Sequence, residues 1–259
     1  MSALTALVLA GSRGPDDPMA VIAGVRHKAL IPVGGVPMVL RVIRALAALP
    51  EIGRIVVCIE QPSLITTLPG LEEAASGKPI ETLMAAGSPA RSVVAALEQY
   101  ATPMLVTTAD HALLEPEWVR YFLTHQPADA DATVGLARSE VVLDATPDTQ
   151  RTFLRFRGGA YSGCNLFYFS SPAAVRLAVL WQRIEALRKQ PLKMLGLLGY
   201  RYALAYRFGW LTIGAALGRL GVISGGTSPA IVELPFGRAA IDVDKPADLA
   251  LVERLVGQG

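Results

Sequence analysis

Three aspartates of this 259-residue chain stand directly after apolar runs, where a carboxylate can meet a bound metal ion. Asp110 closes Val-Thr-Thr-Ala-Asp, and Asp242 and Asp244 lie in Ala-Ile-Asp-Val-Asp near the C-terminus. Residues two apart on a strand share one face, so Asp242 and Asp244 should point the same way. Mg²⁺ prefers one or two carboxylates together with phosphate oxygens and water. We therefore predict Asp110 as a Mg²⁺ ligand, and we expect Asp242 and Asp244 beside the same ion because a dication would remove the repulsion between these carboxylates. The alternative is that Asp110 and Asp244 cap the helices that follow them.

A glycine-rich loop follows the first apolar run, residues 4–10. It reads Leu-Ala-Gly-Ser-Arg-Gly, and such a loop after a buried strand exposes backbone N–H groups that can cradle phosphate oxygens. Arg13 and Lys28 would add positive charge beside a triphosphate, whereas the alternative is an ordinary turn with solvated basic side chains. The predicted nucleotide-binding residues of this region are Leu9, Ala10, Gly11, Ser12 and Gly14, to which Asp110 is added.

A second turn, Ala-Gly-Ser-Pro-Ala-Arg-Ser-Val at 86–93, precedes a predicted helix. A glycine turn followed by Arg and Ser at a helix start can bind the base and ribose edge of a nucleotide. The same letters also fit a capped helix with Ser88 at its N-cap and Pro89 at its first position. The residues predicted here to bind the nucleotide are Gly87, Arg91 and Ser92.

These motifs need a scaffold in which strands and helices alternate. Uninterrupted apolar runs predict buried strands at 4–10, 54–60, 103–108, 131–137, 164–169 and 230–234. Helical spacing of apolar residues predicts helices at 37–49, 89–100, 116–125 and 246–256. The alternation predicts an α/β fold, Rossmann-like, with a mostly parallel sheet and helices on both faces, as one domain over residues 1–259. Ligands of such sheets bind beyond the carboxyl ends of the strands.

The composition limits the partners of the chain. Hydrophobic residues make up 52%, which favours a large core over disorder. Lys and Arg number 24 against 22 Asp and Glu, so the net charge of +2 gives no reason to expect a nucleic-acid partner. Cys58 and Cys164 fit no metal spacing, and we expect two buried thiols in a reducing compartment. The apolar N-terminus lacks a basic region and a cleavage site, so we expect a cytoplasmic protein without a secretion signal.

The motifs together resemble a known family. Leu-Val-Leu-Ala-Gly, followed by Lys-Ala-Leu-Ile-Pro-Val-Gly-Gly-Val-Pro-Met-Val at 28–39, looks like the opening of the MobA-like, sugar-nucleotidyltransferase superfamily. The run Asp-Val-Asp-Lys-Pro-Ala-Asp-Leu at 242–249 is similar to the closing signature of that family. The resemblance implies that the glycine-rich loop wraps nucleotide phosphates and that Lys28, with Arg13, acts on them as a catalytic residue. It also implies Asp110 and Asp244 as the metal ligands.

The resemblance implies a Mg²⁺-dependent nucleotidyltransferase that joins an NTP to a phosphorylated sugar, polyol or alcohol and releases pyrophosphate. Gly163 and Asn165 are the implied acceptor-binding residues, and Arg157 is a candidate for the acceptor phosphate. A loose likeness to cytidylyltransferases, carried by Gly87 and the following Arg91-Ser92-Val93, slightly favours CTP. The enzymatic alternative is a guanylyltransferase for a molybdopterin- or cobinamide-type precursor. The alternative from another class is a non-catalytic, membrane-associated binding module.

Residues 181–223 lie outside this resemblance, and we predict an amphipathic helical insertion there. The longest uncharged stretch, 208–218, has 11 residues and is well short of the ~20 needed to span a bilayer. At about 100° per residue, four basic residues of the segment share an arc of roughly 120°: Lys193, Arg201, Arg207 and Arg219. Three interpretations stay open, namely helices packed on the core of the domain, peripheral contact with the inner face of a membrane, and a homo-oligomer contact.

Overall fold

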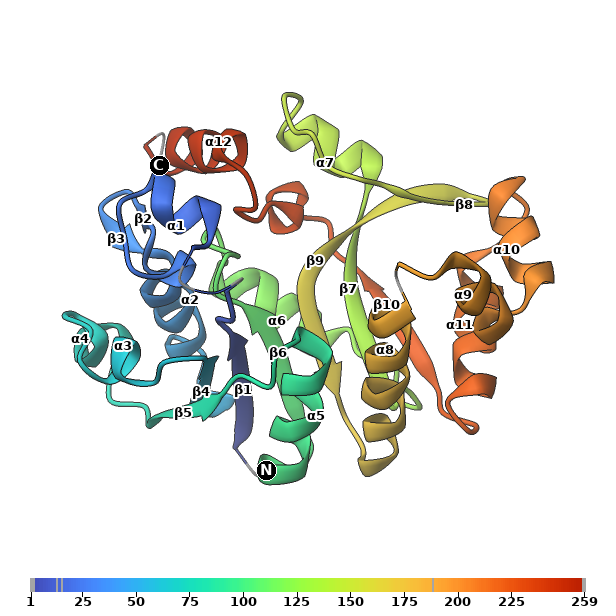
Figure 1. Cartoon of the computed structure of the whole chain (residues 1–259), viewed down its shortest axis with the longest axis horizontal. Helices are drawn as coiled ribbons and strands as arrows, with labels where there is room; N and C mark the ends of the chain where they lie inside the picture. Colours follow the sequence, from blue (N-terminus) through green and yellow to red (C-terminus); the bar gives the residue numbers. More distant parts are fainter. Residues whose placement is uncertain (1–2, 13, 15, 188, 258–259) are drawn as a thin grey trace.

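The computed structural model describes residues 3–12, 14, 16–187 and 189–257. Within them, a sheet of eight strands runs through the middle of the molecule in the order β10-β7-β9-β6-β1-β4-β5, with β8 paired to β9 (Figure 1). The strands are β1 (Leu4–Leu9), β4 (Ile52–Ile59), β5 (Ile80–Met84), β6 (Met104–Thr108), β7 (Ala132–Arg138), β8 (Leu154–Phe156), β9 (Gly159–Phe169) and β10 (Pro229–Glu233). A separate small hairpin consists of β2 (Pro32–Val33) and β3 (Val36–Pro37).

The helices connect these strands and close the chain. They are α1 (Pro18–Ile22), α2 (Met38–Ala47), α3 (Ser63–Thr66), α4 (Leu71–Ala75), α5 (Pro89–Tyr100), α6 (Pro116–Thr124), α7 (Ser139–Ala145), α8 (Val175–Leu187), α9 (Pro191–Leu198), α10 (Tyr200–Arg207), α11 (Ile213–Ile223) and α12 (Pro246–Val256). Three 3-10 turns complete the set: η1 (Lys28–Leu30), η2 (Pro172–Ala174) and η3 (Gly237–Ala240).

The sheet is mostly parallel, as the alternation of strands and helices predicts. The pairs β1-β4, β1-β6, β4-β5 and β7-β10 are parallel. The long strand β9 is antiparallel to both of its neighbours in the sheet order, β6 and β7. The strand β9 therefore runs opposite to the other strands of this order and lies between the two parallel parts of the sheet.

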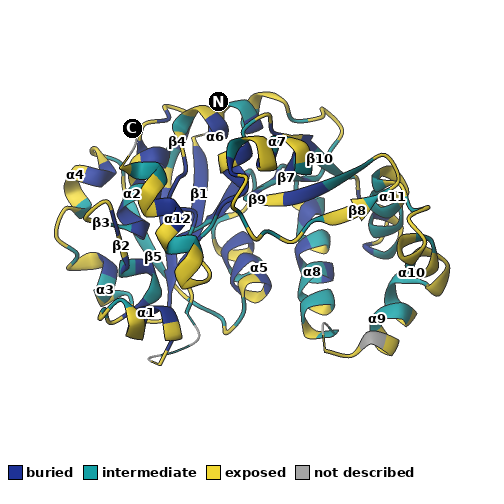
Figure 2. Ribbon diagram, turned by 90° about the horizontal axis from the view of Figure 1, so that it is seen from above, coloured by how far each residue is buried: buried dark blue, intermediate teal, exposed yellow. Residues whose placement is uncertain are grey.

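Alternating side chains of the central strand β1 enter two different cores. Leu7 and Leu9 pack with buried residues of α5 and α8, whereas Ala6 and Val8 pack with those of α2 and α6. A strand that is covered on both faces must be apolar throughout, which explains the uninterrupted run at its start. The predicted helices on both faces of the sheet are thus confirmed, and Figure 2 shows the buried strands between them.

The two cysteines are buried free thiols, as expected. Burial raises the pKa of Cys164 to about 12, against a smaller lowering by Arg151. The thiol is therefore protonated at neutral pH, and it serves as a small apolar side chain of the core.

The segment 181–223 is helical, but it is broken into several helices. Its first residues belong to α8, which packs against α5 over the sheet. The helices α9, α10 and α11 follow, and we call residues 191–223 the helical lobe. Figures 1 and 2 show this lobe beyond α8, on the side of the sheet edge formed by β10. No helix in the described part of the chain combines the length and the apolar character that crossing a bilayer requires.

Candidate active site

The carboxyl ends of four parallel strands form one edge of the sheet and open into a cavity of about 510 Å³. In the register of the sheet, Leu9 lies opposite Cys58 on one side and Thr108 on the other. The backbone ladder continues beyond the strands, with N–H groups of Ala10 and Ala109 donating to Cys58 and Leu9 at 2.8 and 2.9 Å. The loops that follow β1, β4, β5 and β6 therefore meet around this first cavity.

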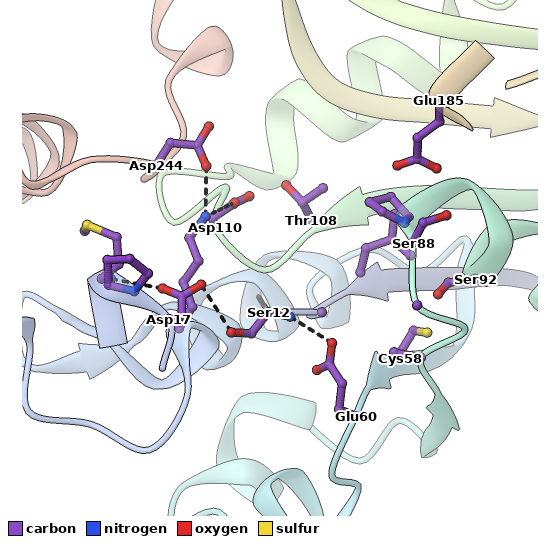
Figure 3. A pocket seen from close by; sticks show the side chains of 18 residues that line it. Ser12, Asp17, Cys58, Glu60, Ser88, Ser92, Thr108, Asp110, Glu185 and Asp244 are labelled. Atoms are coloured by element: carbon purple, nitrogen blue, oxygen red, sulfur yellow. Dashed lines mark hydrogen bonds and ion pairs between the residues drawn. The ribbon is translucent and has the colours of Figure 1, made fainter. Parts of the chain in front are cut away.

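Lys28 joins two of the predicted metal ligands. Its Nζ donates to Oδ2 of Asp110 at 2.7 Å and to Oδ1 of Asp244 at 2.9 Å. In the sequence, Asp110 lies 82 positions after Lys28 and Asp244 lies 216 positions after it, so the fold alone brings the three residues together. Figure 3 shows Asp110 and Asp244 facing each other at the rim of the first cavity.

Asp244 reaches this point because residues 241–244 cross the end of β6. The N–H of Val243 donates to the carbonyl oxygen of Asp110 at 3.0 Å. The carboxylate of Asp248 then accepts from the N–H groups of Asp244 and Lys245 at 3.1 and 2.9 Å and so caps α12. Capping by Asp248 leaves the carboxylate of Asp244 free to face Lys28, so the alternative of Asp244 as the cap of the last helix is wrong.

The charges at this point are tightly coupled. Burial alone would lower the pKa of Lys28, but Asp110 and Asp244 outweigh it through their charges and hydrogen bonds, and its pKa is raised. Burial also raises the pKa of Asp110, opposed by Lys28 and reinforced by the charge of Asp242. The neighbouring His111 is fully buried, and desolvation lowers its pKa to about 4, so its ring is neutral at pH 7.

One oxygen at this point fits a further cation. Oδ1 of Asp110 is buried and has no hydrogen-bond partner among the described groups, and such an atom normally needs one. The described residues contain no cluster of three or more His, Cys, Asp or Glu side chains that could hold a metal by themselves. Two carboxylates, with substrate phosphates and water as the other ligands, are the donor set that suits Mg²⁺. The residues present therefore fit a Mg²⁺ ion that is shared with a phosphorylated substrate.

Glu60 holds the glycine-rich loop beside the turn that carries Lys28. Its Oε1 accepts from the N–H of Ser12 at 2.9 Å, and its Oε2 lies 3.1 Å from Nε2 of His27. Nδ1 of His27 accepts from the N–H of Ala29, so Nε2 carries the proton and donates it to Glu60. Sequence reasoning missed both Glu60 and His27, although Glu60 is the last residue of a predicted strand.

The far end of the first cavity lies between α5 and α8. Ser88 caps α5 by accepting from Arg91 N–H at 3.3 Å, and Pro89 occupies the first turn, as the capped-helix interpretation predicts. Ser92 Oγ accepts from the N–H of Ala86. Glu185 of α8 accepts from the N–H of Ala90 at 3.3 Å and points into the cavity across from Ser88 (Figure 3). No pattern in the sequence distinguishes Glu185 from an ordinary surface residue.

A second cavity, of about 390 Å³, adjoins the first, and Asp244 lines both. Arg151 and Asp242 form an ion pair on its wall, with Nη1 and Oδ1 2.5 Å apart. Nδ2 of Asn165 donates to the other oxygen of Asp242 at 2.7 Å. Arg151 also donates to the carbonyl oxygen of Ala240 at 2.6 Å, which ties it to the segment that precedes Asp242.

Asn165 faces this second cavity because of an irregularity in β9. Val134 of β7 pairs with Phe167, but Leu136 pairs with Gly163, so the register shifts between them. Asn165 sits inside this bulge with a φ of 49°, in the left-handed region that few side chains adopt. Bulges turn side chains away from the regular alternation, and this one directs the amide of Asn165 toward Asp242.

The predicted residues divide into groups by location. Those that line the first cavity are Leu9, Gly11, Ser12, Lys28, Gly87, Ser92, Asp110 and Asp244. Those that line the second are Gly163, Asn165, Asp242 and Asp244. Ala10 and Arg91 are adjacent in the chain to cavity residues, and Gly14 lies two positions after Ser12, but none of the three is part of either lining. Arg13 lies outside the described residues.

Two predictions do not match the geometry. Asp242 was predicted to share a metal with Asp110 and Asp244, but its two oxygens are engaged by Arg151 and Asn165. Arg157 was predicted to meet the acceptor, but it is exposed at the tip of the β8–β9 hairpin, where its N–H donates to Leu211 of the helical lobe. The arginine that lines the second cavity is Arg151.

Comparison with known proteins places this arrangement among transferases. The model of the MobA-like NTP transferase domain matches residues 6–204. A solved structure described as a hypothetical transferase from Thermus thermophilus is similar with a TM-score of 0.80 and 32% identity, over 95% of this chain and 99% of that one. Both likenesses reach into the segment 181–223, which we expected to lie outside the resemblance. The comparison with curated proteins gives no match.

Two more distant structures share the fold. A 4-diphosphocytidyl-2C-methyl-D-erythritol synthase from Anaerococcus prevotii gives a TM-score of 0.62 at 9% identity, over 98% of this chain and 96% of that one. A CMP:2-keto-3-deoxy-manno-octonic acid synthetase complexed with CTP gives 0.54 at 15% identity, over 99% and 98%. At these identities the likeness concerns the fold alone.

Proposed function

The chain belongs to the MobA-like NTP transferase family, and from this we propose that it is a Mg²⁺-dependent nucleotidyltransferase that couples an NTP to a small phosphorylated acceptor. The products would be a nucleotide-diphospho compound and pyrophosphate. The acceptor class is a sugar, polyol or alcohol phosphate.

The observation that carries the proposal is the position of Lys28, Asp110 and Asp244. The two carboxylates and the ammonium group stand where the two cavities meet, and Asp244 lines both of them. A transferase needs such a point, because the reacting phosphates of the two substrates must approach each other while their remaining parts bind on opposite sides. The first cavity would hold the NTP, and the second would hold the acceptor.

Asp110 and Asp244 would hold the Mg²⁺ ion, and the unpartnered Oδ1 of Asp110 supports this assignment. When bound, the ion would neutralise phosphate charge and act as a Lewis acid on a phosphoryl oxygen. Lys28 carries its ammonium on a flexible stem. It can therefore turn from the carboxylates toward the phosphates of the NTP without any movement of the backbone.

In the proposed reaction an oxygen of the acceptor phosphate attacks the α-phosphorus of the NTP. The bond from this phosphorus to the bridging oxygen breaks, and pyrophosphate leaves with the electron pair. A phosphate dianion needs no general base, so the protein acts by positioning and by stabilising charge. N–H groups of the glycine-rich loop would bind phosphate oxygens, and Lys28 would balance the charge that develops on the leaving group.

The second cavity supports a polar acceptor. Its lining includes the side chains of Arg151, Asn165 and Lys245, which supply donors that suit phosphate and hydroxyl oxygens. The guanidinium of Arg151 is already held by Asp242 and Ala240. Its orientation is therefore fixed before the acceptor arrives, which lowers the entropy lost on binding.

CTP is the nucleotide we favour. Residues 87–93, which carry the likeness to cytidylyltransferases, border the far end of the first cavity through Gly87 and Ser92. Two structures of the same fold have descriptions that mention cytidine nucleotides. The carboxylate of Glu185 at this end can accept from an exocyclic amino group, which cytosine carries and uracil lacks.

The decisive experiment incubates the purified chain with each NTP, Mg²⁺ and a panel of phosphate monoesters while pyrophosphate is measured. We expect release that requires both Mg²⁺ and an acceptor and that is fastest with CTP. Release with GTP and a pterin phosphate alone would replace this assignment by the guanylyltransferase alternative. The matched control for Asp110→Asn is Asp129→Asn, at an exposed position away from both cavities. Equal loss in both variants would remove Asp110 from the mechanism.

A further inference from the structure

The helical lobe exposes an unusual number of large apolar side chains. Leu192 is 82% exposed, Tyr200 71%, Phe208 58% and Trp210 68%. Tyr202, Leu204 and Tyr206 are exposed as well, and α10 has no buried residue at all. These exposed side chains all fall within residues 192–210, and monomeric proteins seldom leave large apolar patches in water without a partner. The proposed transfer reaction uses none of these residues.

The charge of the same region is one-sided. Residues 186–232 contain six Lys and Arg and no Asp or Glu, whereas the rest of the chain carries 18 basic against 22 acidic residues. Lys193, Arg201 and Arg207 are exposed among the apolar side chains of the lobe. The lobe is therefore a basic and aromatic surface on an otherwise acidic domain.

The lobe is held together as a unit. Arg219 of α11 donates to the carbonyl oxygens of Leu197 and Leu198 at the end of α9, at 3.2 and 2.8 Å. Its guanidinium also lies 5.6 Å from the ring centroid of Tyr202 in α10. In the turn after α10, Phe208 and Trp210 stack at 5.2 Å. The exposed side chains thus stand on a connected scaffold in which one arginine links all three helices.

We propose that the helical lobe docks on the surface of an anionic lipid bilayer. Tyr and Trp favour the interface between headgroups and acyl chains, because their rings are apolar and their polar tips stay hydrated. Exposed Leu and Phe side chains gain free energy on leaving water. Lys and Arg are attracted by anionic headgroups. The lobe combines these three features on one connected scaffold.

A second copy of the chain is a poorer occupant of this surface. A symmetric dimer brings the same patch of two copies together, so the exposed Lys193, Arg201 and Arg207 of one copy would face those of the other without an acidic group of the lobe between them. A nucleic acid would use the basic residues and some rings, but it offers nothing to the aliphatic side chains of Leu192 and Leu204. An anionic bilayer satisfies the charge and the apolar surface together.

The lobe is coupled to the second cavity through the β8–β9 hairpin. The ring of Phe156 meets that of Tyr206 at 5.7 Å, and the N–H of Arg157 donates to Leu211 at 2.8 Å. From Phe156 the strand β8 leads back to Thr152 on the wall of the second cavity, a distance of about 13 Å at 3.3 Å per residue. Docking of the lobe would therefore place this cavity close to the membrane surface.

The test is flotation of the full chain with vesicles of phosphatidylcholine alone or of phosphatidylcholine and phosphatidylglycerol in equal parts. We expect flotation only with the anionic vesicles and its loss in high salt, where the Debye length falls to about 3 Å at 1 M. Arg201→Glu with Arg207→Glu should weaken binding roughly tenfold or more. Phe208→Ser with Trp210→Ser should weaken it by a similar factor through lost apolar contact.

Matched controls lie outside the lobe. Arg120→Glu with Arg254→Glu makes the same change in net charge at exposed positions of α6 and α12, and Met84→Ser removes an exposed apolar side chain from β5. These variants should float like the original chain. Binding should also shift tryptophan fluorescence to the blue. Trp210→Phe should abolish the shift while flotation persists, because Trp118 is already buried and Trp181 is stacked on Phe167 outside the lobe.

Absence of flotation with anionic vesicles overturns the proposal, as does equal loss in the lobe variants and the controls. Sedimentation velocity without vesicles examines the other occupants. If the chain forms a concentration-dependent dimer that dissociates in the variant Phe208→Ser with Trp210→Ser, the surface belongs to a second copy. If the same residues bind single-stranded RNA, the surface belongs to a nucleic acid. Pyrophosphate release with soluble substrates is measured in parallel, so a failure of docking is distinguishable from a failure of the proposed reaction.

Discussion

The two cavities share Asp244, yet Asp110 beside the first and Asp242 beside the second have different environments. On the side of the first cavity, Asp110 is paired with Lys28 through one oxygen and has no partner for the other among the described groups. On the side of the second, both oxygens of Asp242 are engaged, by Arg151 and Asn165. Incomplete pairing leaves one oxygen of Asp110 able to bind a further cation. Asp242, whose two oxygens are both paired, instead fixes the orientation of Arg151 and Asn165. The same residue type thus has different roles, because the partners that the fold supplies differ.

The largest effect should come from removing the incompletely paired carboxylate. Asp110→Asn should lower kcat about a thousandfold, which is the scale of several kcal/mol that a metal ion contributes to charge stabilisation. Asp242→Asn should lower it far less. Steady-state pyrophosphate release and Mg²⁺ titration of both variants measure the difference. If the two lose activity equally, the contrast between the two carboxylates is wrong.

The next effect is on stability. Arg151→Met removes the partner of Asp242 in a pair whose side chains are only 15% and 13% exposed, and it should lower the free energy of unfolding by about 3 kcal/mol. Arg138→Met breaks the exposed pair with Glu233 and should change stability much less. Urea unfolding followed by circular dichroism compares them. Addition of Asp242→Leu to Arg151→Met should restore part of the loss, and a further loss would show that Asp242 has another essential partner.

Lys28 provides a sharper separation of binding and chemistry. Lys28→Met should lower kcat about a hundredfold, the loss typical for one donor that meets developing charge, and should also raise the KM for the NTP. Lys28→Arg should recover part of the activity, because it keeps the positive charge but replaces the compact ammonium group by a planar guanidinium. Initial rates of pyrophosphate release over a range of NTP concentrations give both kcat and the KM for the NTP. Loss of stability with unchanged kinetic constants would reduce Lys28 to a structural ion pair.

The smallest effect should distinguish the two substrates. Asn165→Gly suits the left-handed backbone at this position but removes the hydrogen bond to Asp242. We expect the KM for the acceptor to rise about tenfold, equivalent to 1.4 kcal/mol, while the KM for the NTP changes little. The matched variant in the first cavity is Ser92→Ala, which should affect the NTP alone. An equal effect of either variant on both constants would argue against separate sites.

Much of the scaffold follows from local pattern. The apolar run of β1 supplies two cores at once, and the ends of α5 and α12 carry the proline and capping residues that the sequence places there. Asp110 could be singled out because a carboxylate after a buried strand lies at the edge where parallel sheets bind ligands. The roles of Lys28 and Asp244 needed the family resemblance, since the local pattern alone fits a solvated lysine and a helix cap equally well.

The sequence by itself therefore indicated six strands of the sheet and four of the helices around it, the edge of the sheet that carries the candidate site, and the residue types that are available there. It did not reveal β5 or β8. Tertiary structure decided which of them meet. Arg151 and Asp242 are 91 positions apart and Lys28 and Asp244 216, and separations of this size leave no periodicity to read. The bulge that turns Asn165 and the crossing that separates Asp242 from Asp244 are set by packing between distant segments. Residues of the same type, such as Asp242 and Asp244, therefore differ because the folded chain gives each of them different partners.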